Sequence, residues 1–306
     1  MINKDQGSSQ DFRRDAERIA LVTDSASDIS ADIAGESGIS IIPIYIHHDG
    51  SEFRDGIDIK PDDIYRLQME KKAVFSTSSP SPHDFILVYG KLLKDFDRIL
   101  SIHISANLSA VMKSARIARD LLKAEKRIEI FDSRSGTMGT GFLVLAAARA
   151  ARKGYSLERI MGIVSFLRDN IRLYGTIDSL KYLRRSGRVP AIASFVSRLL
   201  TIKPLLGISG GQVGMIGIAF TRFGSHREIV RRATRDFKQE RWVMLSVIHT
   251  LRGKDSRKML SELQRSLNIV YSMVNKCTPA VGAHTGPGLI GIIITRLDRE
   301  TADLFI

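Results

Sequence analysis

The sequence predicts an α/β protein made of two α/β domains, and three observations support this prediction. Short apolar runs alternate with longer amphipathic segments between residues 19 and 172, as strands alternate with helices. The connections between these segments are short, which favours a Rossmann-like, mostly parallel sheet covered by helices on both faces. After about residue 172 the pattern changes to a helical stretch, glycine-rich turns and short strands. We therefore expect an N-terminal domain over 19–172 and a smaller C-terminal domain over 173–306.

The first domain is expected to open with a buried strand, IALVTD, that ends in a polar loop. The segment ISIIPIYIHHDG predicts a second strand, closed by an Asp-Gly turn. Pro61 suits the first position of a helix, PDDIYRLQMEKK. Ser81 is expected to cap the following helix, with Pro82 in its first turn and Asp84 completing a capping box.

The remaining elements continue this alternation. In the first domain the pattern predicts strands at 98–105 and 127–133 and helices at 83–93, 109–123 and 139–154. In the second domain it predicts strands at 242–250, 269–275 and 288–297 and helices at 225–240 and 254–268.

Composition limits the class of protein. The single cysteine, Cys277, cannot form an internal disulfide, so we expect a reducing, cytoplasmic location. The chain has neither a CxxC pair nor a dense His/Cys cluster, and we expect no metal and no cofactor. Residues 1–18 are polar, lack the apolar core of a secretory signal and are expected to form a flexible tail.

The formal net charge of +13 favours a nucleic acid, an anionic membrane surface or an acidic protein as a partner. The basic residues are scattered, few aromatic residues lie among them, and no helix-turn-helix or zinc-finger pattern occurs. We therefore expect no nucleic-acid partner.

Polar side chains gather after the expected strand ends, at Asp24-Ser25, Thr77-Ser78, Ser105 to Ser109 and Asp132-Ser133. In open α/β sheets, ligands bind at this edge. The hydroxyls of the segment FSTSSPSP (75–82), Ser109 at a helix N-terminus and His284 before a Gly-Pro-Gly turn predict a site that holds a carboxylate without a fixed lysine or arginine. Taken singly, Ser109 can be an ordinary helix cap and His284 a structural histidine.

A hydrolase is the alternative. Asp24-Ser25 and Asp132-Ser133 at strand ends, with His284 elsewhere, provide the residue types of a Ser/Asp/His constellation. The chain has no G-x-S-x-G elbow, which a serine hydrolase on such a sheet would normally show. The glycine-rich segment GTMGTG lacks the pattern of a P-loop, which argues against a kinase.

Eight motifs in order carry a family resemblance: VTDSASD, DGIDI, TSSPSP, SANLSAVMKSA, FDSRSGTMGTG, LKYLRRSGRV, IKPLLGISGG and HTGPG. From about residue 19 to the C-terminus, the chain resembles the DegV family of fatty-acid-binding proteins. The resemblance implies a long-chain fatty acid in a tunnel between two α/β domains. In bacteria, such carriers present the fatty acid to a separate ATP-dependent fatty acid kinase, whose acyl phosphate product feeds phospholipid synthesis. The carrier itself is then not an enzyme.

The resemblance also implies roles for individual residues. Thr77 and Ser109 would bind the carboxylate, with Ser78, the Ala110 amide and His284 in the same head-group network. Four residues would support that network: Asp24, Ser25, Asp132 and Ser133. Arg188 and Arg222 would face the kinase, and the basic surface would make transient contact with anionic membranes.

The chain departs from the family pattern at four positions: Ser79, Ala110, Val111 and Ser186. The family usually has Gln, Gly, Thr and Gly there. Ala110 keeps its N–H, whereas Val111 removes a hydroxyl. The segments 189–200 and 141–151 are plausible walls of the tunnel.

Overall fold

The structure is a computed structural model that describes residues 17–189 and 202–306. The predicted tail therefore lies outside the described residues, apart from its last two. In the first half of the chain the elements are β1 (Ile19–Asp24), η1 (Ser25–Ser27), α1 (Ala31–Ser37), β2 (Ile39–Ile42), β3 (Tyr45–His48), β4 (Ser51–Arg54), α2 (Pro61–Glu70), β5 (Ser76–Ser78), α3 (Pro82–Leu92), β6 (Arg98–His103), α4 (Val111–Leu121), β7 (Ile128–Asp132), α5 (Met138–Arg152) and α6 (Leu157–Asn170).

The second half contributes β8 (Arg172–Thr176), α7 (Lys181–Ser186), β9 (Lys203–Ser209), β10 (Gln212–Ala219), α9 (Arg222–Phe237), β11 (Val243–His249), α10 (Gly253–Gln264), β12 (Ile269–Lys276), α11 (Pro279–Thr285), β13 (Ile290–Arg296) and α12 (Arg299–Ala302).

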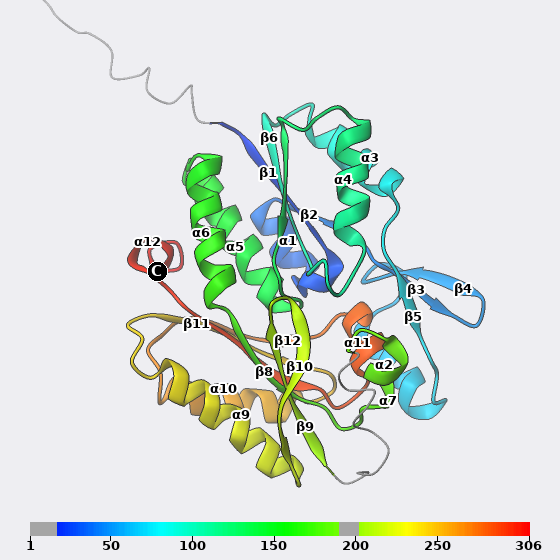
Figure 1. The fold of residues 1–306 in the computed structure, drawn as a ribbon, viewed down its shortest axis with the longest axis vertical. Helices are drawn as coiled ribbons and strands as arrows, with labels where there is room; N and C mark the ends of the chain where they lie inside the picture. Colours follow the sequence, from blue (N-terminus) through cyan, green and yellow to red (C-terminus); the bar gives the residue numbers. More distant parts are fainter. Residues whose placement is uncertain (1–16, 190–201) are drawn as a thin grey trace, which may run out of the picture.

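The N-terminal sheet has four strands in the order β2-β1-β6-β7, all of them parallel. Side chains of β1 alternate between two apolar clusters because successive residues of a strand point to opposite faces. Ala20 and Val22 pack with residues of α3 and α4, whereas Ile19 and Leu21 pack with residues of α5. Helices therefore cover this sheet on both faces, as predicted (Figure 1).

The C-terminal sheet has six strands in the order β10-β9-β8-β13-β11-β12. All of its neighbouring strands are antiparallel except β11 and β12. On one face, α9 and α10 cover Leu245 and Ile292. On the other face, Met244 and Ile293 join the same apolar cluster as α5 and α6. The two sheets are thus connected through one core, with α5 and α6 packed against both.

A third sheet is small and antiparallel, in the order β4-β3-β5. It corrects two sequence-based expectations. The segment ISIIPIYIHHDG is not one strand: β2 and β3 lie in different sheets, separated at Pro43, which has no N–H for a sheet hydrogen bond. Thr77 and Ser78 lie in β5, so they do not follow a strand of the parallel sheet.

Local end signals of the helices are confirmed. Ser81 and Asp84 form the predicted capping box, and Pro61 and Pro82 occupy first-turn positions. Ser109 is not the residue that starts α4, because Ala110 occupies the N-cap position. The α/β class is confirmed, whereas the division of the chain at residue 172 stays a prediction. Within residues 17–189 and 202–306, no helix has the length and apolarity needed to span a bilayer.

Candidate functional site

A cavity lies where the loops of the parallel sheet, the small sheet, α11 and the C-terminal sheet meet. Its apolar lining residues come from both halves of the chain: Ala26, Ile44, Ile104, Leu108, Leu173, Leu183, Val189, Leu206, Ile208, Val213, Ile248, Ala280, Val281 and Leu289. Its polar lining residues are Thr77, Ser78, Ser79, Ser109, Thr137, Arg188, His284 and Thr285. Such a lining suits a ligand with an apolar body and a small polar end.

Two side-chain contacts join polar residues of the lining in pairs. Thr77 Oγ1 lies 2.8 Å from His284 Nε2, and Ser79 Oγ lies 3.1 Å from Ser109 Oγ. Thr77 is held in place by β5, where it pairs with Ile46 of β3. The structure therefore brings together Thr77, Ser109 and His284, as predicted from three distant segments, although their ligand role stays a prediction.

The end of α11 fixes the position of His284. The helix begins with Pro279 at its first position and ends at Thr285, and the capping residue that follows, Gly286, has a φ of +69°. A Cβ atom at Gly286 would lie 2.2 Å from the ring of Tyr182, so this position requires glycine for space as well as for conformation. The chain turn after His284 is thereby packed directly onto α7.

Burial, followed by the positive charge of Arg188, lowers the pKa of His284 to about 4. The imidazole is therefore neutral near pH 7, with one nitrogen that donates and one that accepts. A bound carboxylate would favour the charged imidazole and raise this pKa. The site can thus hold a carboxylate through neutral hydrogen-bonding groups.

Arg188 corrects one expectation, because a fixed cation does line the cavity. Its guanidinium donates a hydrogen bond of 2.9 Å to the carbonyl of Ser186, which holds the side chain beside the loop that follows α7. Ser78 also lines the cavity, and its hydroxyl lies 2.8 Å from Nε2 of His47. The site is therefore more polar and more basic than the sequence suggested.

An open groove adjoins the cavity at Leu108, Ser109 and Arg188. Its lining includes three cationic residues and no acidic residue: Lys113, Arg116 and Arg188 provide the charge. Ala110 lies in this groove and not in the cavity lining, at the N-cap of α4. The groove thus offers positive charge next to the polar end of the cavity.

The predicted supporting residues hold loops and do not line the cavity. Ser25 Oγ accepts a hydrogen bond from the Ile44 amide at 3.0 Å. Asp132 accepts one from the Arg134 amide at 2.8 Å. Ser133 Oγ lies 2.8 Å from the hydroxyl of Thr140 in the first turn of α5. These contacts stabilise the loops that follow β1 and β7, so their effect on the cavity is indirect.

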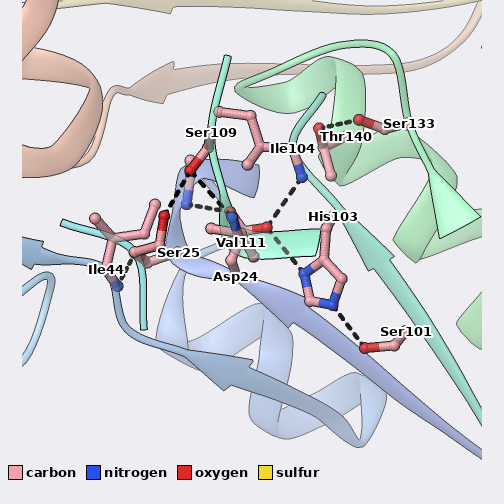
Figure 2. A network of polar contacts seen from close by, with 12 residues as sticks. Asp24, Ser25, Ile44, Ser101, His103, Ile104, Ser109, Val111, Ser133 and Thr140 are labelled. Atoms are coloured by element: carbon pink, nitrogen blue, oxygen red, sulfur yellow. Dashed lines mark hydrogen bonds and ion pairs between the residues drawn. The ribbon is translucent and has the colours of Figure 1, made fainter. Parts of the chain in front are cut away.

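Asp24 belongs to a buried series of hydrogen-bonded side chains that the sequence analysis did not predict. Its Oδ2 accepts from the Ile104 amide and contacts His103 Nδ1, both at 3.0 Å. His103 Nε2 in turn lies 2.7 Å from Ser101 Oγ. Figure 2 shows this line of three side chains. The parallel register that pairs Val22 with Ser101 brings Asp24 beside His103. The contact between these two residues therefore follows from the pairing of β1 with β6, and no local sequence motif indicates it.

The hydrogen-bonded series Ser101–His103–Asp24 has the distances of a Ser-His-Asp triad, but a substrate cannot reach it. Ser101, His103 and Asp24 are each 0% exposed, and none of them lines the cavity. The Ser101 hydroxyl also accepts a hydrogen bond from Tyr89 at 2.8 Å. A serine nucleophile must reach its substrate, and this serine is enclosed. The constellation expected for a hydrolase, with His284 as its base, is not assembled, because the hydroxyl beside His284 is that of Thr77.

Arg222, the first residue of α9, lies outside the cavity lining and is half exposed. Its Nε lies 3.6 Å from the carboxylate of Asp178, which also binds Lys203 at 3.2 Å and contacts Arg252. Burial alone would raise the pKa of Asp178, but Arg252 and Lys203 lower it below its usual value. The carboxylate thus holds three cations at one surface, and the kinase-facing role of Arg222 stays a prediction.

The walls of the cavity differ from those predicted. No residue of the segment 141–151 lines it, because that part of α5 is packed between the two sheets. Strands β8 and β9 and helix α7 line it instead. The segment predicted at 189–200 lies outside the described residues beyond Val189. In the described part of the chain, no group of three or more His, Cys, Asp or Glu residues is arranged to hold a metal ion.

Comparisons with known proteins find relatives that match nearly the whole chain. A family model described as "Uncharacterised protein, DegV family" matches residues 18–297. A DegV domain-containing protein of Caldanaerobacter subterraneus subsp. tengcongensis is 35% identical over 279 residues, which are 90% of this chain and 98% of that protein.

Two solved structures share the fold and are described by what they bind. A DegV family protein from Thermus thermophilus, described by its fatty acid binding, is 30% identical with a TM-score of 0.86 and covers 92% of this chain and 100% of that one. A protein from Eubacterium ventriosum, described as binding stearic acid, is 25% identical with a TM-score of 0.82 and covers 91% and 98%.

Proposed function

This chain belongs to the DegV family, and we propose that it binds a long-chain fatty acid in the cavity. The observation that carries the proposal is the apolar cavity whose polar lining includes the contact pairs Thr77–His284 and Ser79–Ser109. The fatty acid binding described for the relatives from Thermus thermophilus and Eubacterium ventriosum supports it.

The acyl chain provides the affinity and the hydroxyls provide the orientation. Each buried CH₂ group contributes about 0.8 kcal/mol. A chain of about sixteen carbons therefore contributes on the order of 10 kcal/mol before the cost of ordering it. Ser109 can donate a hydrogen bond to the carboxylate while it accepts one from Ser79, and either Thr77 or His284 can donate a second, because these two already share one hydrogen bond. A head group held in this way keeps an oxygen available for reaction.

The second part of the proposal is that the chain is a carrier for a separate ATP-dependent fatty acid kinase and performs no chemistry itself. The basic groove lined by Lys113, Arg116 and Arg188 begins at Ser109, where the carboxylate would lie. Positive charge there suits a phosphoryl group arriving from a partner. The acyl phosphate would then feed phospholipid synthesis in the cytoplasm, with transient contact between the basic surface and anionic membranes.

Native mass spectrometry of the purified protein, followed by organic extraction and lipid analysis, tests the first part. We expect one fatty acid per chain, and the same experiment identifies its length. A protein that is purified empty and also refuses added palmitate and oleate would contradict fatty acid binding.

Arg222→Glu tests the second part. Because Arg222 lies outside the cavity lining, the variant should bind oleate with unchanged affinity. Phosphorylation of the bound oleate by a fatty acid kinase should slow by about tenfold, as expected when one charge of a docking surface is reversed. Arg231→Glu, a change of another exposed arginine on α9, serves as the matched control. An equal loss of oleate binding and phosphorylation would show that Arg222 supports the fold instead.

A further inference from the structure

Two aspartates outside the cavity are buried with carboxyl oxygens that lack hydrogen-bond partners. Asp28 follows η1, Asp55 follows β4, and each is 3% exposed. Both carboxyl oxygens of Asp55, one carboxyl oxygen of Asp28 and Thr278 Oγ1 make no hydrogen bond of normal geometry among the described residues, although Ser25, Thr278 and the Ala280 amide lie close enough to Asp55 to oppose part of the rise in its pKa. A carboxylate that is buried without a partner is strongly disfavoured and retains a proton instead. The two groups therefore require an explanation that the head-group site does not give.

The surroundings of the pair contain no compensating positive charge. Burial first, and then the repulsion by Asp28, raise the pKa of Asp55 to about 7, and burial raises that of Asp28 to about 7. The other titratable groups nearby are Cys277 and Tyr65, and burial raises the pKa of both.

Lys276, which precedes Cys277 in the chain, binds another carboxylate and not the pair. Lys276 donates a hydrogen bond of 2.7 Å to Asp62 at the surface. No lysine, arginine or histidine of the described residues contacts the carboxyl group of Asp28 or Asp55 in a hydrogen bond or ion pair. Each carboxyl group in such surroundings keeps its proton at pH values at which an exposed aspartate has lost it.

The pair lies where the three sheets meet. Asp28 follows β1 of the parallel sheet, Asp55 follows β4 of the small sheet, and Thr278 connects β12 of the C-terminal sheet to α11. Asp28 Oδ1 accepts a hydrogen bond of 2.8 Å from the Thr278 amide. Asn275 donates one of 2.6 Å to the Asp28 carbonyl. The loop after β1 is thus bound through Asp28 to the end of β12 and the start of α11.

Helix α11 connects the pair to the cavity. The Ala280 amide at its start is near Asp55, and the side chains of Ala280, Val281 and His284 line the cavity. His284 follows Thr278 by six residues, which is about 9 Å along a helix. A displacement of the start of α11 would therefore move His284 relative to Thr77.

We propose that Asp28 and Asp55 are positioning residues that hold α11 while both carboxyl groups are protonated, so that this pair controls how tightly the cavity binds its ligand. When both protons leave to solvent, two buried negative charges repel each other without a cation. Their repulsion is relieved by moving Asp55 away from the start of α11, and His284 shifts with the helix. The identity of the ligand used below rests on the proposed fatty acid binding.

The test compares Asp55→Asn and Asp28→Asn with the matched control Asp58→Asn. Asp58 follows Asp55 by three residues, but it is bound at the surface by Arg54, which lowers the pKa of Asp58 to about 2. The equilibrium constant of unfolding is measured by urea titration between about pH 4 and 8.5 without ligand. The dissociation constant of oleate is measured between about pH 6.5 and 9.

In the native protein the folded state holds protons that the unfolded state has released above about pH 4. We therefore expect the unfolding constant to rise with pH up to about 7, by up to tenfold per pH unit for each proton retained. Asp55→Asn should lower this slope by one proton. Its affinity for oleate should stay constant where that of the native protein falls several-fold, whereas Asp58→Asn should follow the native protein in both measurements.

Equal pH slopes of unfolding in the native protein, Asp55→Asn and Asp28→Asn would overturn the proposal. The proposal would also be overturned if the unfolding slopes differ while the oleate affinity has the same pH dependence in all three proteins. If Asp55→Asn does not fold, the comparison rests on Asp28→Asn. This variant should fold, because the new side-chain amide oxygen can still accept the hydrogen bond from the Thr278 amide. A native protein that binds no oleate at any pH would contradict the proposed function alone, since the unfolding slopes are measured without ligand.

Discussion

Two histidines, His103 and His284, make the same kind of contact in very different surroundings. His103 lies 2.7 Å from the Ser101 hydroxyl and His284 lies 2.8 Å from the Thr77 hydroxyl. The other ring nitrogen of His103 contacts Asp24, and its side chain is fully buried. His284 lines the cavity near Arg188, and no carboxylate of the described residues is hydrogen-bonded to it.

The difference shows that the surroundings, more than the residue types, separate a structural network from a candidate binding site. In the series Ser101–His103–Asp24, the hydrogen-bonding groups already have protein partners, and these hydrogen bonds join β1 to β6. Among the described residues, no carboxylate is hydrogen-bonded to His284 as Asp24 is to His103, so that position is open to the carboxylate of a ligand. The sequence offers the residue types of a hydrolase in both regions, yet neither assembles one with access to a substrate.

The largest expected effect breaks the buried network. Asp24→Ala removes the acceptor of three hydrogen bonds, from the Ala26 amide, His103 and the Ile104 amide. Because buried donors are then left without partners, we expect a loss of about 3–5 kcal/mol in the free energy of unfolding. Urea denaturation measures this loss. Asp132→Ala is the control, since it removes one contact of a partly exposed carboxylate; a loss as small as in the control would contradict a structural role for Asp24.

The next effect concerns pH and His284. Its pKa is about 4 in the folded protein and about 6.5 in the unfolded chain, so the unfolded state binds more protons between these values. The stability due to the neutral imidazole is therefore complete above pH 6.5 and is lost as the pH falls towards 4, by up to about 3 kcal/mol.

Comparing the native protein with His284→Gln isolates this contribution from that of the buried aspartates, which changes in the opposite direction. Urea denaturation between about pH 4 and 7 should show a weaker pH dependence of this kind in His284→Gln. Added oleate should reduce the loss in the native protein, because a carboxylate favours the charged imidazole. Parallel curves for the two proteins would show that His284 does not change its protonation on unfolding.

A smaller effect sharpens the role of the open histidine. Thr77→Val keeps the shape of the side chain but removes the hydroxyl beside His284. We expect about a tenfold weaker affinity for oleate, since one hydrogen bond to a charged group is worth about 1.5 kcal/mol. Isothermal titration calorimetry measures the change, and Thr295→Val, which alters a hydroxyl outside the cavity lining that bonds to the Arg296 carbonyl, is the control. An unchanged affinity would remove Thr77 from the head-group site.

The smallest effect returns to the buried histidine. Tyr89→Phe removes the hydrogen bond that Ser101 accepts from Tyr89 but leaves the contact between His103 and Asp24 in place. We expect a loss of about 1 kcal/mol in the free energy of unfolding and no change in oleate affinity. Urea denaturation and calorimetry on one preparation check both results. A change in affinity larger than the change in stability would connect this network directly to the cavity.

The sequence by itself determined the features that depend on neighbouring residues. The alternation of apolar runs predicts the α/β class because each period follows from the geometry of one element. The capping box of Ser81 and Asp84 was predictable because its partners are three residues apart. The prediction of a single strand around Pro43 was wrong, because the same alternation of apolar residues continues through β2 and β3, which belong to different sheets.

The tertiary structure alone decided which polar residues meet. Thr77 and His284 are 207 residues apart, and Asp24 and His103 are 79 residues apart. Their contacts depend on strand register and on the position of α11, which are set by the packing of buried side chains over the whole chain. The same holds for Asp28 and Asp55: their motifs are visible in the sequence, but their burial without a cation follows only from the meeting of three sheets.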